Sequence, residues 1–449
     1  MKNSDKKEFF SSSISDWSII ASLVSGSGIL LIQQLIQSKR ADLLLLFLEP
    51  AIALAFSIVF FVPMWAKLKL QHEGELMQYR YSGKGADLLQ KFRNHLLCWL
   101  ILPLIIALQL ASIQSISHLG LDSRALVILL LAATLILTVT RYHFDRMIKL
   151  EIGVFIATAL VTAGHCIYSG THGTREPCTY LGQALDAKLI APPLLFFWWF
   201  SGLVDIPDMR AQKLLQIKAS SLLRFKVAMP YAAMFLIQSV YLWKPLHPDQ
   251  SFFIPVICML LLNALTFINS NLHWSASLMT PFNSSKGNIA PRQNIKRINS
   301  VQIASISIAI LILISGKTIQ DIFSSIIFLT AGVGPIYLLR WIWYRVNAWT
   351  QLSAMIGAIA FSLAISFMFP QLHYYKQLAL AGTINIGVAL VIMFLTQREN
   401  ENQKARAFIV QISSQNPFKD LRNWFAFAGL ALFFILILFS VQILNYYYH

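Results

Sequence analysis

About 13 apolar segments of this chain are long enough to cross the hydrocarbon core of a bilayer, which needs about 20 residues of helix. They lie at 17–36, 42–66, 95–115, 124–140, 150–169, 188–206, 227–244, 252–280, 301–316, 321–346, 351–369, 375–396 and 423–445. Charged residues make up 12% of the chain, against about 25% in a soluble domain. We therefore predict an all-α integral membrane protein, since helices satisfy their own backbone in lipid.

The distribution of Lys and Arg predicts the orientation of these spans. Most of the 36 Lys and Arg residues lie in the N-terminal tail, in even-numbered loops (each loop numbered after the span before it) or at the span ends beside them. Basic residues collect in cytoplasmic loops because they resist translocation. We predict a multi-pass protein of the cell (inner) membrane with a cytoplasmic tail at 1–16 and an external C-terminus.

This loop bias also accounts for the net charge of +16, so no nucleic-acid partner is predicted. Contact of the basic loops with anionic lipid headgroups is expected as a side effect.

The spans divide into two blocks of nearly equal length, 17–169 and 188–346, followed by three spans in the C-terminal region 347–449. Because each block contains five helices, the two blocks have opposite orientation in the membrane. An inverted repeat of this kind is the layout of many secondary transporters.

Three cytoplasmic regions carry local structural signals. The segment 72–94 has a helical pattern on either side of a Tyr-Ser-Gly-Lys turn, and the segment 283–299 is rich in turn residues. Arg340 and Arg345 flank Trp341 and Trp343 at the end of a span, where snorkelling Arg and belt-forming Trp side chains are expected.

Five segments resemble the bacterial solute:sodium symporter family, in family order and over nearly the whole chain. The most specific is AGVGPIYLLRWIWYRVNAWTQLSAMIGAIAFSL at 331–363, which is similar to the tenth core helix and the loop after it. The others are EFFSSSISDWSIIASLVSGSG (8–28), ELMQYRYSGKGADLLQKFRN (75–94), FFWWFSGLVDIPDMRAQKLLQIK (196–218) and LTFINSNLHWSASLM (265–279). The family's usual helix before the first core helix is lacking.

The resemblance implies a LeuT-like five-plus-five core with three additional C-terminal helices. It also implies a sodium site between the first and eighth core helices, made of backbone carbonyls and two adjacent hydroxyl groups. The matching positions here are Ser25, Gly28, Asn263 and Thr266, with Phe267 where the family has its second hydroxyl. A ring cannot ligate sodium, so the ion site is predicted to be eroded, although Asn263 offers an amide oxygen in compensation.

Other polar side chains within the spans are substrate-binding candidates. They are Ser22, Ser27, Glu49, Trp198, Trp199, Asn269 and Ser270. Each has an alternative that the sequence leaves open. The Ser-Gly run at 25–28 is either an unwound break or a packing surface of small residues. Asn269 and Ser270 either line a cavity or bond between helices, Glu49 either faces a cavity or reaches the interface, and the two Trp side chains either stack on substrate or pack.

Two functions fit these features. The first is a secondary active transporter that moves a small polar solute by alternating access with an eroded sodium site. The alternative is a transport-inactive symporter homologue acting as a membrane scaffold, sensor or complex subunit. No nucleophile–base constellation or nucleotide-binding turn is apparent in the sequence, so no enzyme activity is predicted. No cofactor is predicted beyond sodium as a coupling ion; the bilayer and the solute are the predicted partners, and no protein partner is predicted.

The orientation can be tested by cysteine labelling in cells, on a background without native cysteines. Ala290→Cys, in an even-numbered loop, should react only with reagents that enter the cytoplasm, and Glu176→Cys, in an odd-numbered loop, should react from outside, since Lys and Arg collect in the cytoplasmic loops. Labelling of both positions from the same side would exclude the inverted repeat.

Overall fold

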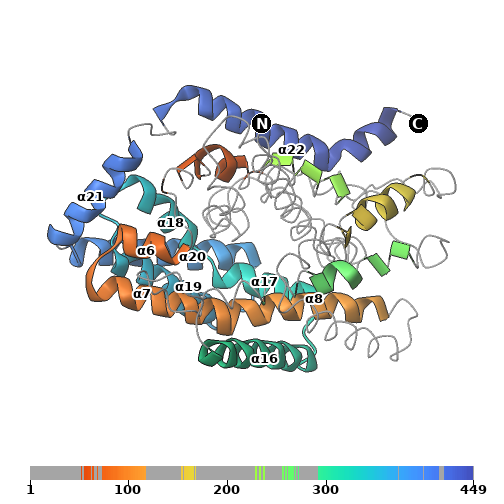
Figure 1. The fold of residues 1–449 in the computed structure, drawn as a ribbon, viewed down its shortest axis with the longest axis horizontal. Helices are drawn as coiled ribbons and strands as arrows, with labels where there is room; N and C mark the ends of the chain where they lie inside the picture. Colours follow the sequence, from red (N-terminus) through yellow and green to blue (C-terminus); the bar gives the residue numbers. More distant parts are fainter. Residues whose placement is uncertain are drawn as a thin grey trace.

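The computed structural model describes residues 55–61, 73–117, 292–372, 374–397, 399–413 and 419–447, most of 153–167 and 255–268, and a few positions elsewhere. Within these residues the chain forms helices and turns and no strand (Figure 1). The helices are η2 (Ser57–Phe61), α6 (Glu73–Arg80), α7 (Gly83–Leu96), η3 (Leu97–Ile101), α8 (Leu102–Ser117), α16 (Arg292–Ile314), α17 (Ile319–Leu329), α18 (Val333–Ile342), α19 (Ala348–Met368), α20 (Tyr374–Leu395), α21 (Glu399–Ser413) and α22 (Leu421–Tyr447).

The described parts of the predicted spans are mostly helical, although their bounds differ in places. Four described helical segments are long and apolar enough to cross a membrane: Gly83–Ser112, Asp321–Ile342, Ala348–Met368 and Lys376–Leu395. The α22 helix matches the predicted span 423–445. The 13-span count and the inverted repeat stay predictions, because large parts of both blocks lie outside the described residues.

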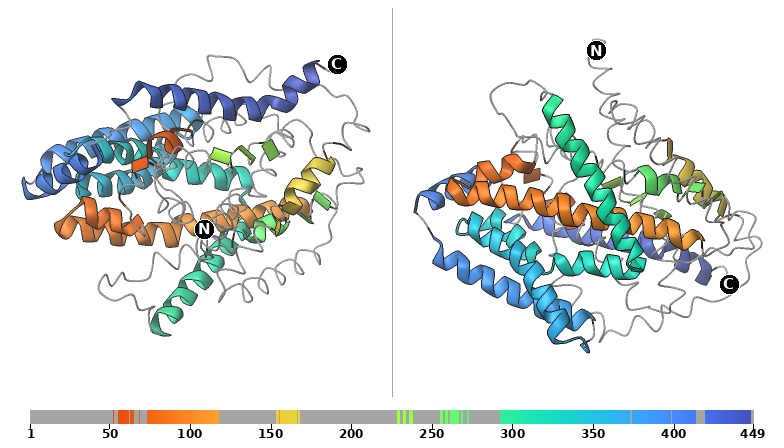
Figure 2. Two further views of the ribbon diagram at one scale, coloured as in Figure 1. Left: turned by 45° about the horizontal axis from the view of Figure 1, so that its top comes forward. Right: turned by 90° about the horizontal axis from the view of Figure 1, so that it is seen from below.

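One boundary differs from the expectation, and one expected turn is confirmed. The α16 helix begins at Arg292, inside the segment predicted to be rich in turns, and it crosses the long α7–α8 helix in Figure 2. The turn expected after α6 is confirmed: α6 ends at Arg80, and Gly83 begins α7 with a φ of 75°. Only glycine adopts that left-handed backbone without strain.

Large apolar side chains lie on the surface as well as in the core, and several polar side chains are buried. Large apolar residues are exposed along several helices, among them Leu160, Leu311, Leu363, Val391 and Phe425. Fully or nearly fully buried positions hold Thr158, Asn263, Ser305, Ser362 and Asn385. Lipid accepts apolar side chains at the surface, whereas polar groups in a bilayer must find partners inside the protein. The arrangement supports a membrane-embedded protein.

The span predicted at 321–346 consists of two helices, not one. The α17 helix ends at Leu329, the α18 helix begins at Val333, and Gly332 between them has a φ of 78°. The interruption ends the α-helical bonding of α17, and Ile327 O and Phe328 O accept instead from Thr330 N and Ala331 N. Other carbonyl groups at the break, and those with spare acceptor capacity, need partners within the protein if the break lies in a bilayer.

Side chains of the two following helices satisfy these carbonyls. The hydroxyl of Ser362 in α19 donates to the carbonyl of Phe328. The amide of Asn385, in the middle of α20, donates to Ala331 O and to Ala354 O of α19, both at 2.9 Å. The helix pair α19–α20 therefore holds the broken span in place.

At one end of the molecule, Arg80 joins three segments that are distant in sequence. Its guanidinium is 1% exposed and donates to Arg340 O, Trp343 O and Val346 O at 2.9, 3.0 and 3.2 Å. It also lies 5.2 Å from the ring of Phe408 in α21. The C-terminal carbonyls of a helix carry partial negative charge, so they stabilise a buried cation. Burial lowers the pKa of Arg80 to about 10, which leaves it charged at neutral pH.

The α21 helix packs on the same junction. Lys404 donates to Tyr81 O at 2.8 Å, and the Tyr79 hydroxyl donates to Gln411 at 2.7 Å. The segments that meet here belong to loops 2, 10 and 12, which the charge pattern assigns to one side of the membrane. Their contact agrees with the predicted parity, and which side faces the cytoplasm stays a prediction.

The interpretation of Arg340 and Trp341 as interfacial residues was wrong. They are 1% and 2% exposed. The Arg340 guanidinium lies 4.7 Å from the ring of Tyr337 within its own helix, and its Nη1 is 3.4 Å from Gln351 Oε1. Both side chains turn inward because α6, α19 and α21 cover this end of α18.

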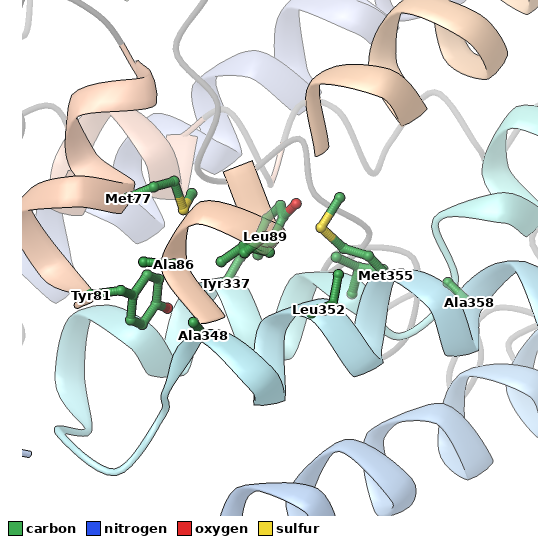
Figure 3. Close-up of a cluster of buried hydrophobic side chains, with 10 residues drawn as sticks. Met77, Tyr81, Ala86, Leu89, Tyr337, Ala348, Leu352, Met355 and Ala358 are labelled. Carbon is green, nitrogen blue, oxygen red and sulfur yellow. The ribbon is translucent and has the colours of Figure 1, made fainter. Parts of the chain in front are cut away.

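A core of apolar side chains lies next to these arginines. Figure 3 shows Met77, Leu89, Tyr337, Leu352 and Met355, from α6, α7, α18 and α19, packed against one another. Asn347 begins α19 by accepting a bond from Thr350 N at 2.9 Å, and its amide donates to Thr396 at the end of α20. These contacts join the first residues of α19 to the end of α20.

The broken span gives a stability prediction. A Cβ added to Gly332 would lie 2.7 Å from Gly382 O, with its backbone in the left-handed region. Gly332→Ala should cost about 2–4 kcal/mol from backbone strain and overpacking, seen as a lower melting temperature in detergent. Gly387→Ala, at a helical glycine with open space around it, is the matched control and should not destabilise. Equal melting temperatures for the two variants would show that the break is not tightly packed.

Candidate functional site

Of the predicted ion-binding residues, the structure describes Asn263 and Thr266. Both lie in the helical stretch 261–266 and are 1% and 3% exposed. The remaining candidates fall outside the described residues: Ser22, Ser25, Ser27, Gly28, Glu49, Trp198, Trp199, Asn269 and Ser270. The possible break of the first span at 25–28, and Phe267, also fall outside them.

Asn263 contacts a residue that the sequence interpretation did not select. Its Nδ2 donates to the hydroxyl of Thr158, at a distance of 2.8 Å. Thr158 belongs to the helical stretch Ile156–His165 in the predicted fifth span, and its side chain is 0% exposed. The fifth and eighth spans therefore touch through two buried polar side chains.

The bonding of Thr158 determines how the Asn263 amide is turned. The Thr158 hydroxyl has one proton, and it donates that proton to Val154 O at 2.7 Å. Towards Asn263 the hydroxyl can therefore only accept, so Asn263 must present its NH₂ group. The orientation follows from the hydrogen-bond network and not from the positions of the atoms alone.

The amide oxygen of Asn263 is left without a donor. Asn263 Oδ1 is buried and has no hydrogen-bond partner among the described residues. Leaving such an acceptor unsatisfied costs about 1–3 kcal/mol. A buried acceptor with no donor is a position where a cation is favoured, since a cation replaces the missing partner.

Thr266 adds a second oxygen one turn further along. Its hydroxyl donates to Leu262 O and to Asn263 O, both at 3.0 Å. The proton is directed back along the helix, so the lone pairs of the oxygen face away from these carbonyls. Among the described residues no donor reaches them, which leaves Thr266 Oγ1 able to coordinate a cation.

The helix at 156–165 carries a polar stripe. Thr158, Thr162 and His165 are all at most 4% exposed, whereas Ile156 and Leu160 are 51% and 69% exposed. A spacing of four and three residues places the polar group on one helical face. This spacing was the signal in the sequence that could have identified Thr158, but nothing in the sequence places the stripe beside Asn263.

The chemistry of these oxygens favours a monovalent hard cation. Amide and hydroxyl oxygens are hard and neutral, whereas divalent ions are usually held with carboxylates. Among the described residues, no group of three His, Cys, Asp or Glu side chains could hold a metal ion.

Comparisons with known proteins bear on the fold. No family model matches the chain, and no curated protein matches it. It is similar to the solved structure of the substrate-bound, outward-open state of a Na⁺-coupled sialic acid symporter, at 15% identity and a TM-score of 0.52, over 86% of this chain and 90% of that chain. A mutant of the Eremococcus coleocola manganese transporter aligns over 96% of this chain and 94% of its own at 14% identity, with a TM-score of 0.24. At this identity, the similarity to the symporter structure shows a shared fold.

The pairing of Thr158 with Asn263 can be tested by substitution. Thr158→Val removes the acceptor for a buried NH₂ group and should cost about 1–3 kcal/mol. Thr158→Ser keeps the hydroxyl and should remain closer to the unsubstituted protein. The measurement is the melting temperature of purified protein in sodium-free buffer. If the Thr158→Val and Thr158→Ser variants have the same melting temperature, the hydrogen bond contributes nothing to stability.

Proposed function

We propose that this protein is a secondary active transporter that moves a small polar solute by alternating access, coupled to a monovalent cation. By the family resemblance that cation is sodium. The observation that carries the proposal is the buried Oδ1 of Asn263, which has no donor among the described residues. Protein interiors rarely leave such a group unsatisfied without a ligand or a functional reason.

In this proposal Asn263 Oδ1 and Thr266 Oγ1 are side-chain ligands of the ion. Thr158 holds the Asn263 amide with its oxygen directed away from the Thr158 hydroxyl. Ser25 and Gly28 of the first span supply the remaining oxygens, as the family resemblance implies. The shared fold with a sodium-coupled symporter supports this arrangement of spans. The candidates Ser22, Ser27, Glu49, Trp198, Trp199, Asn269 and Ser270 are proposed to line the solute pathway.

A transport-inactive homologue is the second candidate. The feature that favours it is Phe267, which replaces a hydroxyl that the family uses for sodium. An ion that loses a ligand recovers less of its dehydration cost, so its affinity falls. The two candidates therefore differ in whether the remaining oxygens still bind sodium.

Sodium-dependent thermal stabilisation separates them. A ligand that binds only the folded state raises the melting temperature by mass action. Sodium should stabilise the purified protein more than choline at equal ionic strength. Thr266→Ala should abolish the sodium-dependent shift. Thr383→Ala is its matched control, since Thr383 also donates to the carbonyl four residues before it but is exposed on α20.

Restoring the missing hydroxyl gives the converse test. Phe267→Thr should enlarge the sodium-dependent shift because it adds an oxygen ligand. The substitution also removes a large apolar side chain, which can cost roughly 3 kcal/mol. The readout is therefore the shift caused by sodium and not the melting temperature itself. If the unsubstituted protein shows no shift at high sodium, the transporter proposal fails and the scaffold candidate replaces it.

A further inference from the structure

Two exposed arginines meet at one tyrosine beside the end of a predicted span. Arg345 follows α18, and its Nε lies 3.4 Å from the Tyr344 hydroxyl. Arg406 belongs to α21, and its guanidinium lies 4.5 Å from the centre of the same ring. The two arginines are more than fifty residues apart in sequence and reach one point only because α21 folds back against loop 10.

Among the side chains whose placement the structure describes, no carboxylate contacts Arg345 or Arg406, and both arginine side chains are exposed. Hydrogen bonds from Arg345 first and Arg406 second lower the pKa of the Tyr344 phenol, which lies beyond the end of α18. Two guanidinium groups that favour negative charge on a shared phenol will also favour an oxyanion beside it.

An apolar surface lies next to the arginines. Phe394 and Leu395, at the end of α20, are 54% and 78% exposed. The ring of Phe394 is 6.3 Å from that of Trp343, and Gln397 donates to Arg345 O at 3.1 Å. The end of α20 therefore lies against the segment that carries Arg345.

The level of this site in the membrane follows from the two adjoining spans. The span candidates Asp321–Ile342 and Lys376–Leu395 both end here. Residues just beyond the hydrocarbon core lie at the depth of lipid headgroups, and we expect the exposed Phe394 and Leu395, inside the span, to face acyl chains. The arginines thus lie at the level of a phospholipid headgroup, and the apolar side chains lie at the level of its acyl chains.

We propose that Tyr344, Arg345 and Arg406 bind the phosphate of an anionic phospholipid whose acyl chain lies along Phe394 and Leu395. Arginine forks match phosphate oxygens in pairs, and an anionic headgroup adds charge attraction that a zwitterionic one lacks. Because the phosphate touches loop 10 and α21 together, the lipid joins the C-terminal helices to the end of the broken span. The site is separate from the cation site, and its test does not depend on transport.

The full-length protein, purified in a neutral detergent, is titrated with dioleoyl phosphatidylglycerol, with dioleoyl phosphatidylcholine and with inorganic phosphate, and its melting temperature is recorded. Phosphatidylglycerol should raise the melting temperature more than phosphatidylcholine does. Arg345→Gln and Arg406→Gln should each weaken its apparent affinity on the order of tenfold, as expected for loss of a charge-assisted hydrogen bond. The controls Lys419→Gln and Arg422→Gln remove exposed charges from the same loop region and should leave the affinity unchanged.

Three results would overturn the proposal: equal stabilisation by the two lipids, equal losses in the arginine and control variants, or stabilisation by inorganic phosphate that matches phosphatidylglycerol. The last result would indicate a site for a free oxyanion.

If a Gln variant does not fold, Arg345→Lys and Arg406→Lys are used in its place. They keep the charge but lose the paired geometry, and they should still bind the phospholipid more weakly than the unsubstituted protein. In the unsubstituted protein, raising the salt concentration should reduce the difference between the two lipids, and a difference insensitive to salt would also contradict the proposal.

Discussion

The structure depends on one constraint: a backbone group inside a bilayer must find its hydrogen-bond partner within the protein. The break at Thr330–Gly332 shows how the constraint is met. Ser362 adds a donor to Phe328 O, and Asn385 donates to Ala331 O, from the next two helices. Close contact with Gly382 is then possible only because position 332 lacks a side chain. The C-terminal helix pair is thus a structural requirement of the broken span.

Two buried asparagines show how the same chemistry serves different ends. Both donate through their NH₂ groups, and both have an Oδ1 without a hydrogen-bond donor among the described residues. The oxygen of Asn385 lies where a side chain on Gly357 would begin, so the neighbouring helix fills its surroundings. The oxygen of Asn263 is oriented by Thr158. The hydroxyl oxygen of Thr266, the second candidate ligand, lies one turn away. We therefore assign a packing role to Asn385 and propose a binding role for Asn263.

The arginines near the end of α18 differ in role because different elements cover them. Arg80 is buried against the last carbonyls of that helix, which replace the carboxylate that a buried cation usually needs. Arg340 lies over an aromatic ring of its own helix. Arg345 and Arg406 remain exposed beside Tyr344. The elements packed around each arginine therefore decide whether it is a structural or a surface residue.

The sequence by itself determined the class of the protein and the approximate positions of several C-terminal spans, because hydrophobic length acts residue by residue. The helices α19, α20 and α22, the α6–α7 turn and the contact between even-numbered loops agree with that interpretation. It could not foresee that the span 321–346 is broken, or that Arg340 is buried, because both depend on which helices pack alongside. Asn263 and Thr266 were predicted by resemblance, whereas Thr158 was not, since the hydrogen bond that turns the Asn263 amide joins residues about a hundred positions apart. Only tertiary structure brings such residues together, and only there does a polar side chain acquire the partner that decides its role.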